Sequence, residues 1–146
     1  MNRSRPCWSV LVVDDEESVR TGLVSVLESD RVEVTGAASL QEAEGFLRRG
    51  QFDLVVTDLR MGGSLSFEGL EVIWRVRERS PETRIVLFTA FGTPEIEEAA
   101  KRLGATDCWS KAMPIPNIMS RLRALGIPVG RPDRGSTGGA EGGGNP

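Results

Sequence analysis

Short apolar runs alternate along this chain with longer segments whose apolar residues recur at helical spacing. The first run, 10–13, is continuously apolar, as expected of a strand that is buried on both faces of a sheet. Residues 19–27 then carry apolar side chains at positions i, i+4, i+7 and i+8. The same succession continues to a last helical stripe over 115–125. This alternation favours a parallel sheet covered by helices.

The pattern predicts five strands, each followed by a helix, with connections short enough for right-handed crossovers. The expected strands are 10–13, 32–35, 52–57, 84–88 and 107–110. We therefore predict an α/β fold, a doubly wound five-stranded parallel sheet in (βα)5 order. In such sheets ligands bind at the carboxyl ends of the strands, so the residues that follow the strands should be compared as a set.

The ends of the chain differ in composition from its middle. Eight of the 17 glycines fall at or after Gly126. We expect an N-terminal extension over 1–7, a packed domain over 8–125 and a flexible Gly/Pro-rich tail or linker over 126–146. The tail is too short and polar for a helix-turn-helix or an enzymatic output domain. A stand-alone domain with a loose tail is slightly favoured over a domain cut from a longer chain within its linker.

The chain contains no histidine, and its formal net charge is −3. The missing histidine excludes Ser-His and Cys-His nucleophile systems, imidazole metal sites and a phosphohistidine carrier. The mild acidity favours neither nucleic acid nor an anionic membrane surface. Cys7 and Cys108 match no disulfide framework and no metal motif, and no apolar stretch is long enough to span a bilayer. These features predict a cytoplasmic protein.

Ionic or hydroxyl side chains follow four of the five expected strands. They are Asp14 and Asp15, Asp58, Thr89 and Lys111. Three carboxylates in one crevice repel one another, so they take up protons or bind a hard cation, and oxygen ligands favour Mg²⁺. An aspartate beside such a cation, with a lysine and a hydroxyl near the phosphoryl oxygens, suits phosphoryl transfer to that aspartate.

The residues that carry this pattern resemble the signature of bacterial two-component response-regulator receiver domains. The motifs are VLVVDD at 10–15, DLRM at 58–61, Thr89-Ala90 and Lys111, and the resemblance spans about residues 8–125. It implies the chemotaxis-type (βα)5 fold, with flavodoxin-like strand order 2-1-3-4-5. It also implies that Asp58 accepts a phosphoryl group from the phosphohistidine of a sensor histidine kinase or phosphotransfer protein in a phosphorelay, with slow autodephosphorylation afterwards.

The resemblance implies a role for each residue at the strand ends. The implied Mg²⁺ ligands are Asp14, Asp15, Asp58 and the backbone carbonyl of Arg60, of which Asp15 is the favoured direct side-chain ligand of the acidic pair. Thr89 is the implied switch hydroxyl, Lys111 contacts the phosphoryl group, and the N–H of Ala90 faces it. The implied output surface comprises the fourth helix, fifth strand and fifth helix. Its partner is an unknown output protein or a second copy of the chain, without nucleic acid or membrane.

Three features depart from the family pattern. Ala112 replaces the usual proline after Lys111, and we expect a trans bond there because a cis bond before alanine costs about 3 kcal/mol. Cys108 stands where an aromatic side chain normally reports phosphorylation. Gly69 lies eleven residues past Asp58 instead of the usual eight, which lengthens the intervening loop. These departures motivate one alternative, a degenerate receiver that binds proteins without being phosphorylated.

A haloacid-dehalogenase-like phosphatase is a weaker alternative, because that family needs Asp-x-Asp and Glu16 stands at the second position here. Other conspicuous side chains are interpreted as structural. Trp74 is expected in the core and Cys108 as a small buried apolar residue. Arg48 and Arg49, like the arginines of 75–79, are expected to be solvated cations near helix C-termini.

Overall fold

The computed structural model describes residues 8–61, 67–90 and 92–129, which hold five strands and five helices in strict alternation. The strands are β1 (Trp8–Val13), β2 (Val32–Ala37), β3 (Leu54–Thr57), β4 (Arg84–Thr89) and β5 (Asp107–Ser110). The helices are α1 (Glu17–Leu27), α2 (Leu40–Arg49), α3 (Glu68–Arg79), α4 (Pro94–Leu103) and α5 (Ile115–Ala124). Within these ranges, none of the helices combines the length and apolar character that crossing a bilayer requires.

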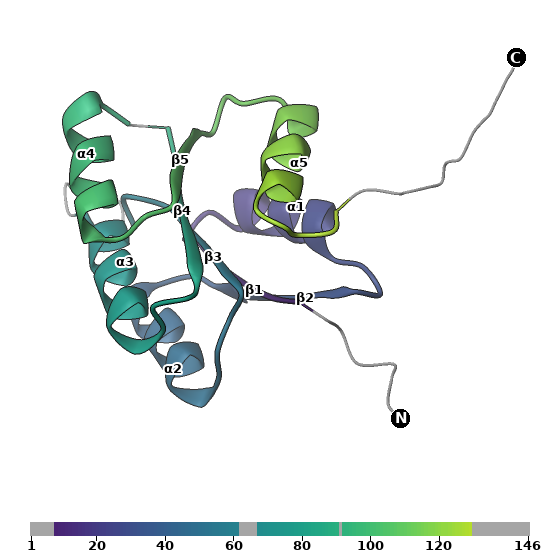
Figure 1. Ribbon diagram of the computed structural model, residues 1–146, viewed down its shortest axis with the longest axis horizontal. Helices are drawn as coiled ribbons and strands as arrows, with labels where there is room; N and C mark the ends of the chain where they lie inside the picture. The colour runs from purple at the N-terminus through teal and green to yellow at the C-terminus, as the bar shows by residue number, and fades with distance from the viewer. Residues whose placement is uncertain (1–7, 62–66, 91, 130–146) are drawn as a thin grey trace, which may run out of the picture.

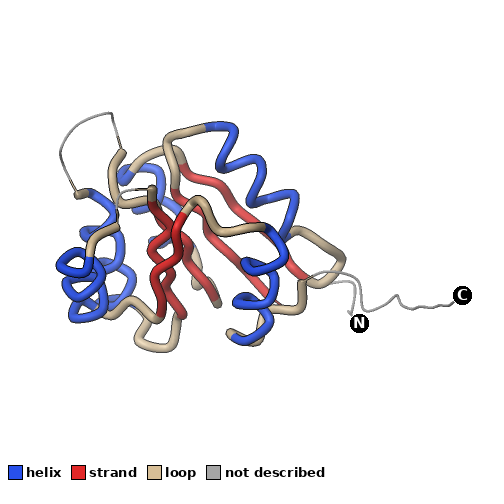
Figure 2. Tube along the Cα trace, turned by 90° about the horizontal axis from the view of Figure 1, so that it is seen from above, coloured by secondary structure: helices blue, strands red, loops and turns tan. Residues whose placement is uncertain are grey.

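All five strands are parallel, in the order β2-β1-β3-β4-β5. Helices α2, α3 and α4 cover one face of the sheet, while α1 and α5 cover the other (Figures 1 and 2). The predicted fold class and strand order are therefore confirmed.

The central strand β1 is buried on both faces, which explains its continuous apolar run. Val10 and Val12 pack in the core beneath α1 and α5. Leu11 and Val13, which point the opposite way because side chains alternate along a strand, pack beneath α2, α3 and α4. The sheet thus separates two apolar cores.

Helix starts follow the chemistry of their first residues. The Ser39 hydroxyl accepts the N–H of Glu42 at 3.1 Å, and the Thr93 hydroxyl accepts the N–H of Ile96 at 3.2 Å. Ser39 and Thr93 are therefore the N-caps of α2 and α4. The predicted strand over 52–57 begins only at Leu54; just before it, the Asp53 carboxylate accepts the N–H of Ser9 at 2.8 Å.

Two expectations about the core differ from the structure. The packed region continues past 125, because Ile127 is 1% and Val129 is 6% exposed within the core beneath α1 and α5. Trp74, expected in the core, is 48% exposed, since α3 buries Val72, Ile73 and Val76 and so turns position 74 outward.

Candidate functional site

The carboxyl ends of β1, β3 and β5 bring three predicted site residues to one edge of the sheet. Asp14 directly follows β1, Asp58 follows β3 and Lys111 follows β5. Backbone hydrogen bonds hold these ends in register: the Asp58 N–H donates to the Val13 carbonyl at 2.8 Å, and the Lys111 N–H to the Thr89 carbonyl at 3.1 Å. The sheet topology therefore fixes the backbone positions of these three residues at one edge.

The three predicted carboxylates lie close together. Asp14, Asp15 and Asp58 each offer an oxygen, and these oxygens lie within 4.8 Å of one another. The Lys111 ammonium is 2.8 Å from Asp14 Oδ2 and 3.3 Å from Asp58 Oδ1. Asp14 and Asp58 are buried, whereas Asp15 is exposed.

Glu16 adds a fourth carboxylate that sequence reasoning missed. Its Oε1 lies 3.6 Å from Lys111 Nζ, and its backbone N–H donates to Asp14 Oδ1 at 2.9 Å. The sequence did offer a signal for Glu16. An aspartate side chain often accepts the backbone N–H two residues later, and Glu16 stands two residues after Asp14. We call these residues, Asp14, Asp15, Glu16 and Asp58 with Lys111, the acidic cluster.

Asp58 is held by one oxygen. Oδ1 accepts the Leu59 N–H at 2.8 Å and faces Lys111. Burial, and then the neighbouring Asp14 carboxylate, raise the pKa of Asp58 to about 6, although Lys111 and the Leu59 N–H act in the opposite direction. Asp58 is therefore a basic carboxylate that is still mostly ionised at neutral pH.

Lys111 remains a cation in this setting. Burial lowers its pKa, but the hydrogen bond and charge of Asp14, followed by the charge of Asp58, outweigh burial and raise the pKa above its usual value. The Lys111–Ala112 bond is trans, as predicted. The lysine thus reaches both buried carboxylates without the proline that usually follows it in the resembled family.

The other predicted site residues lie beside the acidic cluster. Thr89 ends β4 and is 4% exposed. Ala90, which follows it, is exposed. Arg60 lies two residues past Asp58, and its guanidinium stands 5.8 Å from the centre of the Phe67 ring.

A glycine lets α3 pack directly on the backbone of Asp58. The Gly69 N–H donates to the Leu59 carbonyl at 2.9 Å, and a Cβ on Gly69 would lie 1.9 Å from the Asp58 carbonyl oxygen. The longer loop predicted between them falls on 62–66, outside the described residues. Gly69 is therefore required by close backbone approach rather than by an unusual φ angle.

The acidic cluster fits a divalent cation bound by oxygen. Its carboxylates outnumber its single ammonium group four to one. Asp14 Oδ2 is buried, and in the described part of the chain the Lys111 ammonium lies 2.8 Å away from it. Carboxylate oxygens at this spacing, without nitrogen or sulfur, are the ligands that hard cations such as Mg²⁺ and Ca²⁺ prefer.

Two adjacent residues of β5 face opposite sides of the sheet beside this cluster. Cys108 packs against the core beneath α2, α3 and α4. Trp109 packs beneath α1 and α5, edge-on to Phe88, with ring centres 6.5 Å apart. Its indole N–H donates to Asp107 Oδ2 at 2.9 Å, so the ring is held at both ends.

Comparison with known proteins gives a family match over most of the chain. The model of the response regulator receiver domain matches residues 10–123. The chain is 32% identical over 115 residues to the response regulator protein PilR of Pseudomonas aeruginosa, which covers 79% of this chain and 24% of PilR. It is 33% identical over 118 residues to the photosynthetic apparatus regulatory protein RegA of Rhodobacter capsulatus, covering 81% of this chain and 62% of RegA.

A solved structure shares the fold as well. A response regulator protein from Burkholderia pseudomallei, crystallised with a phosphorylated aspartic acid, calcium ion and citrate, superposes with a TM-score of 0.69 at 25% identity. The match covers 80% of this chain and 71% of that one. The chain spans only 24% and 62% of the lengths of PilR and RegA, so these matches concern one part of longer proteins.

Proposed function

Because this chain belongs to the response regulator receiver domain family, we propose that it accepts a phosphoryl group on Asp58 from a partner's phosphohistidine. The observation that carries the proposal is the position of Asp58, a buried carboxylate 3.3 Å from a lysine and within 4.8 Å of two further aspartates. These 146 residues contain no histidine, so the proposed donor imidazole lies outside them, in a sensor kinase or a phosphotransfer protein.

The two oxygens of Asp58 have different tasks in this proposal. Oδ1 is occupied by the Leu59 N–H and by Lys111. Oδ2 has no partner in the described part of the chain and is the attacking atom. Its O–P bond forms as the P–N bond to the donor imidazole breaks, and the released nitrogen takes a proton. Attack by water on phosphorus later breaks the O–P bond, releases inorganic phosphate and restores the carboxylate.

Three carboxylates and one backbone carbonyl supply a metal site in the same proposal. Asp14, Asp15 and Asp58, with the carbonyl of Arg60, would hold Mg²⁺, which when bound neutralises charge on the phosphoryl oxygens. Asp15 is exposed and so accessible to an entering ion. The likeness to the Burkholderia protein, with its phosphorylated aspartic acid and calcium ion, supports both parts.

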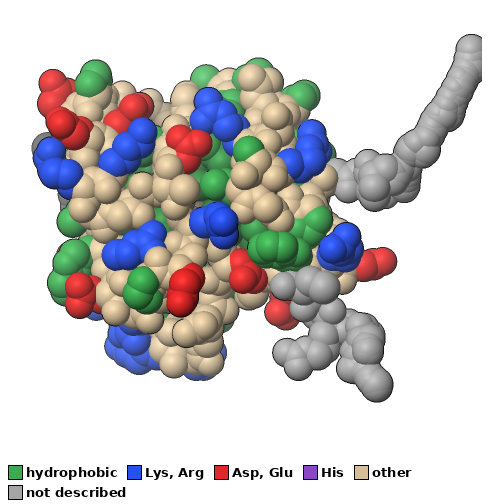
Figure 3. Space-filling model, viewed as in Figure 1, with side chains coloured by type: hydrophobic (Ala, Val, Ile, Leu, Met, Phe, Trp, Pro, Cys, Tyr) green, Lys and Arg blue, Asp and Glu red, His purple; other side chains and the backbone are tan. Residues whose placement is uncertain are grey.

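The remaining predicted residues hold the transferred group. Lys111 offers its ammonium to one phosphoryl oxygen, and Thr89 and the Ala90 N–H offer hydrogen bonds to others. These contacts bias the ends of β4 and β5, and with them the α4–β5–α5 surface that meets an output protein or a second copy. Basic and acidic side chains are interspersed on the face shown in Figure 3, which supports a protein partner rather than nucleic acid.

Intact-mass measurement tests the proposal. The chain is incubated with Mg²⁺ and acetyl phosphate, and we expect one phosphoryl adduct. Asp58→Ala removes the adduct, whereas Asp30→Ala retains it, because Asp30 lies in an exposed turn before β2. Chelation of Mg²⁺ also removes the adduct.

Absence of the adduct from folded wild-type chain with excess donor would contradict the proposal. That outcome favours the degenerate receiver that acts by protein contact alone. Retention of the adduct in Asp58→Ala would place the phosphoryl group elsewhere and contradict the assigned residue.

A further inference from the structure

A hollow of about 380 Å³ lies at the opposite end of the sheet from Asp58, between the C-terminal ends of α2 and α3. Three arginines line it: Arg48 and Arg49 from the last turn of α2, and Arg79 from the last turn of α3. No aspartate or glutamate is found among its described lining residues. We call it the arginine hollow.

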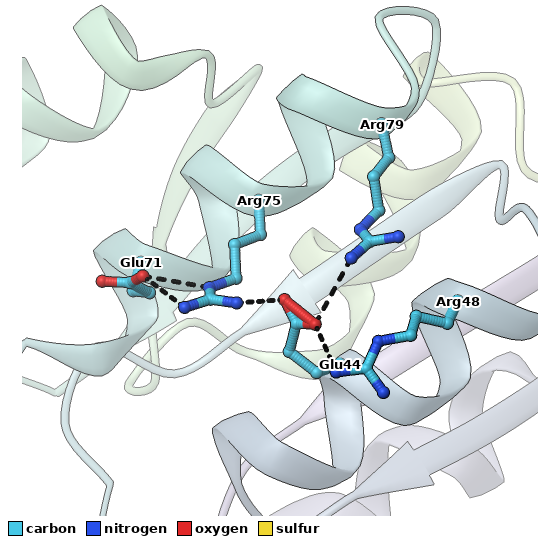
Figure 4. A network of polar contacts seen from close by, with 5 residues as sticks. All are labelled: Glu44, Arg48, Glu71, Arg75 and Arg79. Atoms are coloured by element: carbon cyan, nitrogen blue, oxygen red, sulfur yellow. Dashed lines mark hydrogen bonds and ion pairs between the residues drawn. The ribbon is translucent and has the colours of Figure 1, made fainter.

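The arginines beside the hollow outnumber their acidic partners. Figure 4 shows Glu44 of α2 shared by guanidinium groups from two helices. Glu44 Oε1 lies 3.6 Å from Arg48 and 3.4 Å from Arg79, and Arg75 contacts its other oxygen. The hydrogen bond from Arg75, aided by the charges of all three arginines, holds the pKa of Glu44 below its ordinary value despite burial. Arg75 also pairs with Glu71 at 2.8 Å, so two carboxylates serve these three arginines and a positive surplus remains.

Arg49 has no acidic partner in the described part of the chain. Its guanidinium stands 5.3 Å from the centre of the Phe46 ring. This cation–π contact does not use the guanidinium N–H groups as hydrogen-bond donors. Arg77 behaves differently, because it donates to the carbonyls of Ser80 and Gly104 at the ends of α3 and α4. Arg77 is thus the helix-capping arginine, while Arg49 retains free donors.

Apolar side chains and buried hydroxyls also line the hollow. The apolar lining residues are Leu47, Phe52 and Val76. Ser80 and Thr83 are 8% and 4% exposed, and their hydroxyl oxygens lie 2.7 Å apart. Cavities that combine apolar walls with a few polar groups at roughly this volume are typical of sites for small organic ligands, about 300–1,000 Å³.

We propose that the arginine hollow binds a small organic anion. A carboxylate or phosphate group contacts Arg48, Arg49 and Arg79, and an apolar or aromatic body covers Leu47 and Phe52. The hollow shares no lining residue with the acidic cluster, since it lies at the other end of the sheet.

Titration of the full chain by backbone amide NMR, without divalent cations, tests the site. The probes are benzoate and phenyl phosphate. Benzamide is the control that has the aromatic ring without the charge, and inorganic phosphate is the control that has the charge without the ring. We expect saturable shifts around Gly50, Gln51 and Ser80 with both aromatic anions. Benzamide and inorganic phosphate bind at least about tenfold more weakly, because charge-assisted hydrogen bonds and apolar burial both contribute.

Matched variants separate the site from general electrostatic attraction. Arg49→Ala weakens benzoate binding by about fivefold or more. Arg102→Ala leaves it unchanged, because Arg102 lies on α4 and pairs with Glu98 at 3.6 Å. Asp58→Ala also leaves it unchanged. Thermal melting confirms that each variant is folded.

Four results would overturn the proposal. They are equal affinity for benzamide, equal affinity for inorganic phosphate, shifts centred on the acidic cluster, and equal weakening by Arg49→Ala and Arg102→Ala. Absence of saturable shifts from the folded wild-type chain would overturn it as well.

Discussion

The two ends of the sheet both gather charged side chains, but the surplus has opposite sign. The acidic cluster holds four carboxylates around Lys111, and the pKa of Asp58 rises to about 6. At the other end several arginines surround Glu44, and the pKa of Glu44 falls. The same functional group is thus left short of positive charge at one end and oversupplied at the other. Only the first arrangement calls for a cation.

Helix α3 connects the two ends. Its first turn packs on the Asp58 backbone through Gly69, and its last turns carry Arg75 and Arg79 to Glu44. The start of α3 is therefore held by close backbone contact, and its end is held by ion pairs between side chains. Substitutions at the two ends should differ in size accordingly.

Gly69→Ala tests the backbone contact and has the largest expected effect. A Cβ at 1.9 Å from the Asp58 carbonyl oxygen cannot be accommodated unless the backbone shifts. We expect a loss of about 3 kcal/mol or more in the free energy of unfolding, as for severe overpacking. Urea denaturation followed by circular dichroism measures it.

Gly22→Ala is the matched control, because an added Cβ there meets nothing within 4 Å. Within α1 this change should stabilise by about 0.5–1 kcal/mol through helix propensity. If both variants shift stability equally, close approach is not the reason for Gly69.

Asp58→Asn tests the acidic cluster and has the second-largest expected effect on stability. The pKa of Asp58 is raised to about 6 in the folded chain, above the unfolded value near 3.9, so the folded state binds more protons between these pH values. Stability therefore falls as pH rises from 4 to 6. Without divalent cations, Asp58→Asn should be about 1–2 kcal/mol more stable than wild type at pH 8, with little difference at pH 4.

Mg²⁺ should narrow or reverse the difference in stability between Asp58→Asn and wild type at pH 8. At ten times its Kd, an ion that binds only the folded wild-type chain adds about 1.4 kcal/mol. Urea denaturation at pH 8 with and without Mg²⁺ measures both effects. A wild-type chain as stable as Asp58→Asn in chelator at pH 8 would contradict the charge imbalance.

Glu44→Gln tests the arginine end and has the smallest expected effect. Its partners are 36–67% exposed, so solvent weakens each ion pair and we expect a loss of about 1 kcal/mol at pH 7. The pKa of Glu44 is lowered in the folded chain, so its contribution is present above the unfolded value near 4.3 and disappears as pH falls through the folded pKa.

Chemical denaturation at pH 7 and pH 3 measures this dependence. Glu98→Gln, which breaks one ion pair between exposed residues, is the control and should change stability by less than about 0.5 kcal/mol. Equal effects from the two variants would show that sharing Glu44 among several arginines adds nothing.

The strand ends were predictable because the evidence for them is local. Apolar runs mark the strands, and a parallel sheet necessarily brings Asp14, Asp58 and Lys111 to one edge. The role of Glu44 was not predictable, because its partners Arg75 and Arg79 come from a separate helix whose approach depends on tertiary packing. The sequence interpretation treated those arginines as solvated.

Two local errors have different physical origins. Trp74 adjoins an apolar stripe, but the buried face of α3 is centred on Val72, Ile73 and Val76, and helical spacing alone does not decide which flank faces water. Ile127 and Val129 stand among glycine and proline, whose composition suggested a tail although both side chains are buried.

The buried ring of Trp109 gives the protein an optical reporter. The chain has three tryptophans and no tyrosine, so indole dominates its near-ultraviolet emission. Trp74 is 48% exposed and within reach of a dissolved quencher such as iodide, whereas Trp109 is 2% exposed and shielded. The shielded ring lies in register with Phe88, the residue before Thr89, and two positions before Lys111. Of these two rings, the one that iodide leaves unquenched therefore lies beside the proposed phosphorylation site, whereas the third tryptophan, Trp8, is half-buried at the start of β1.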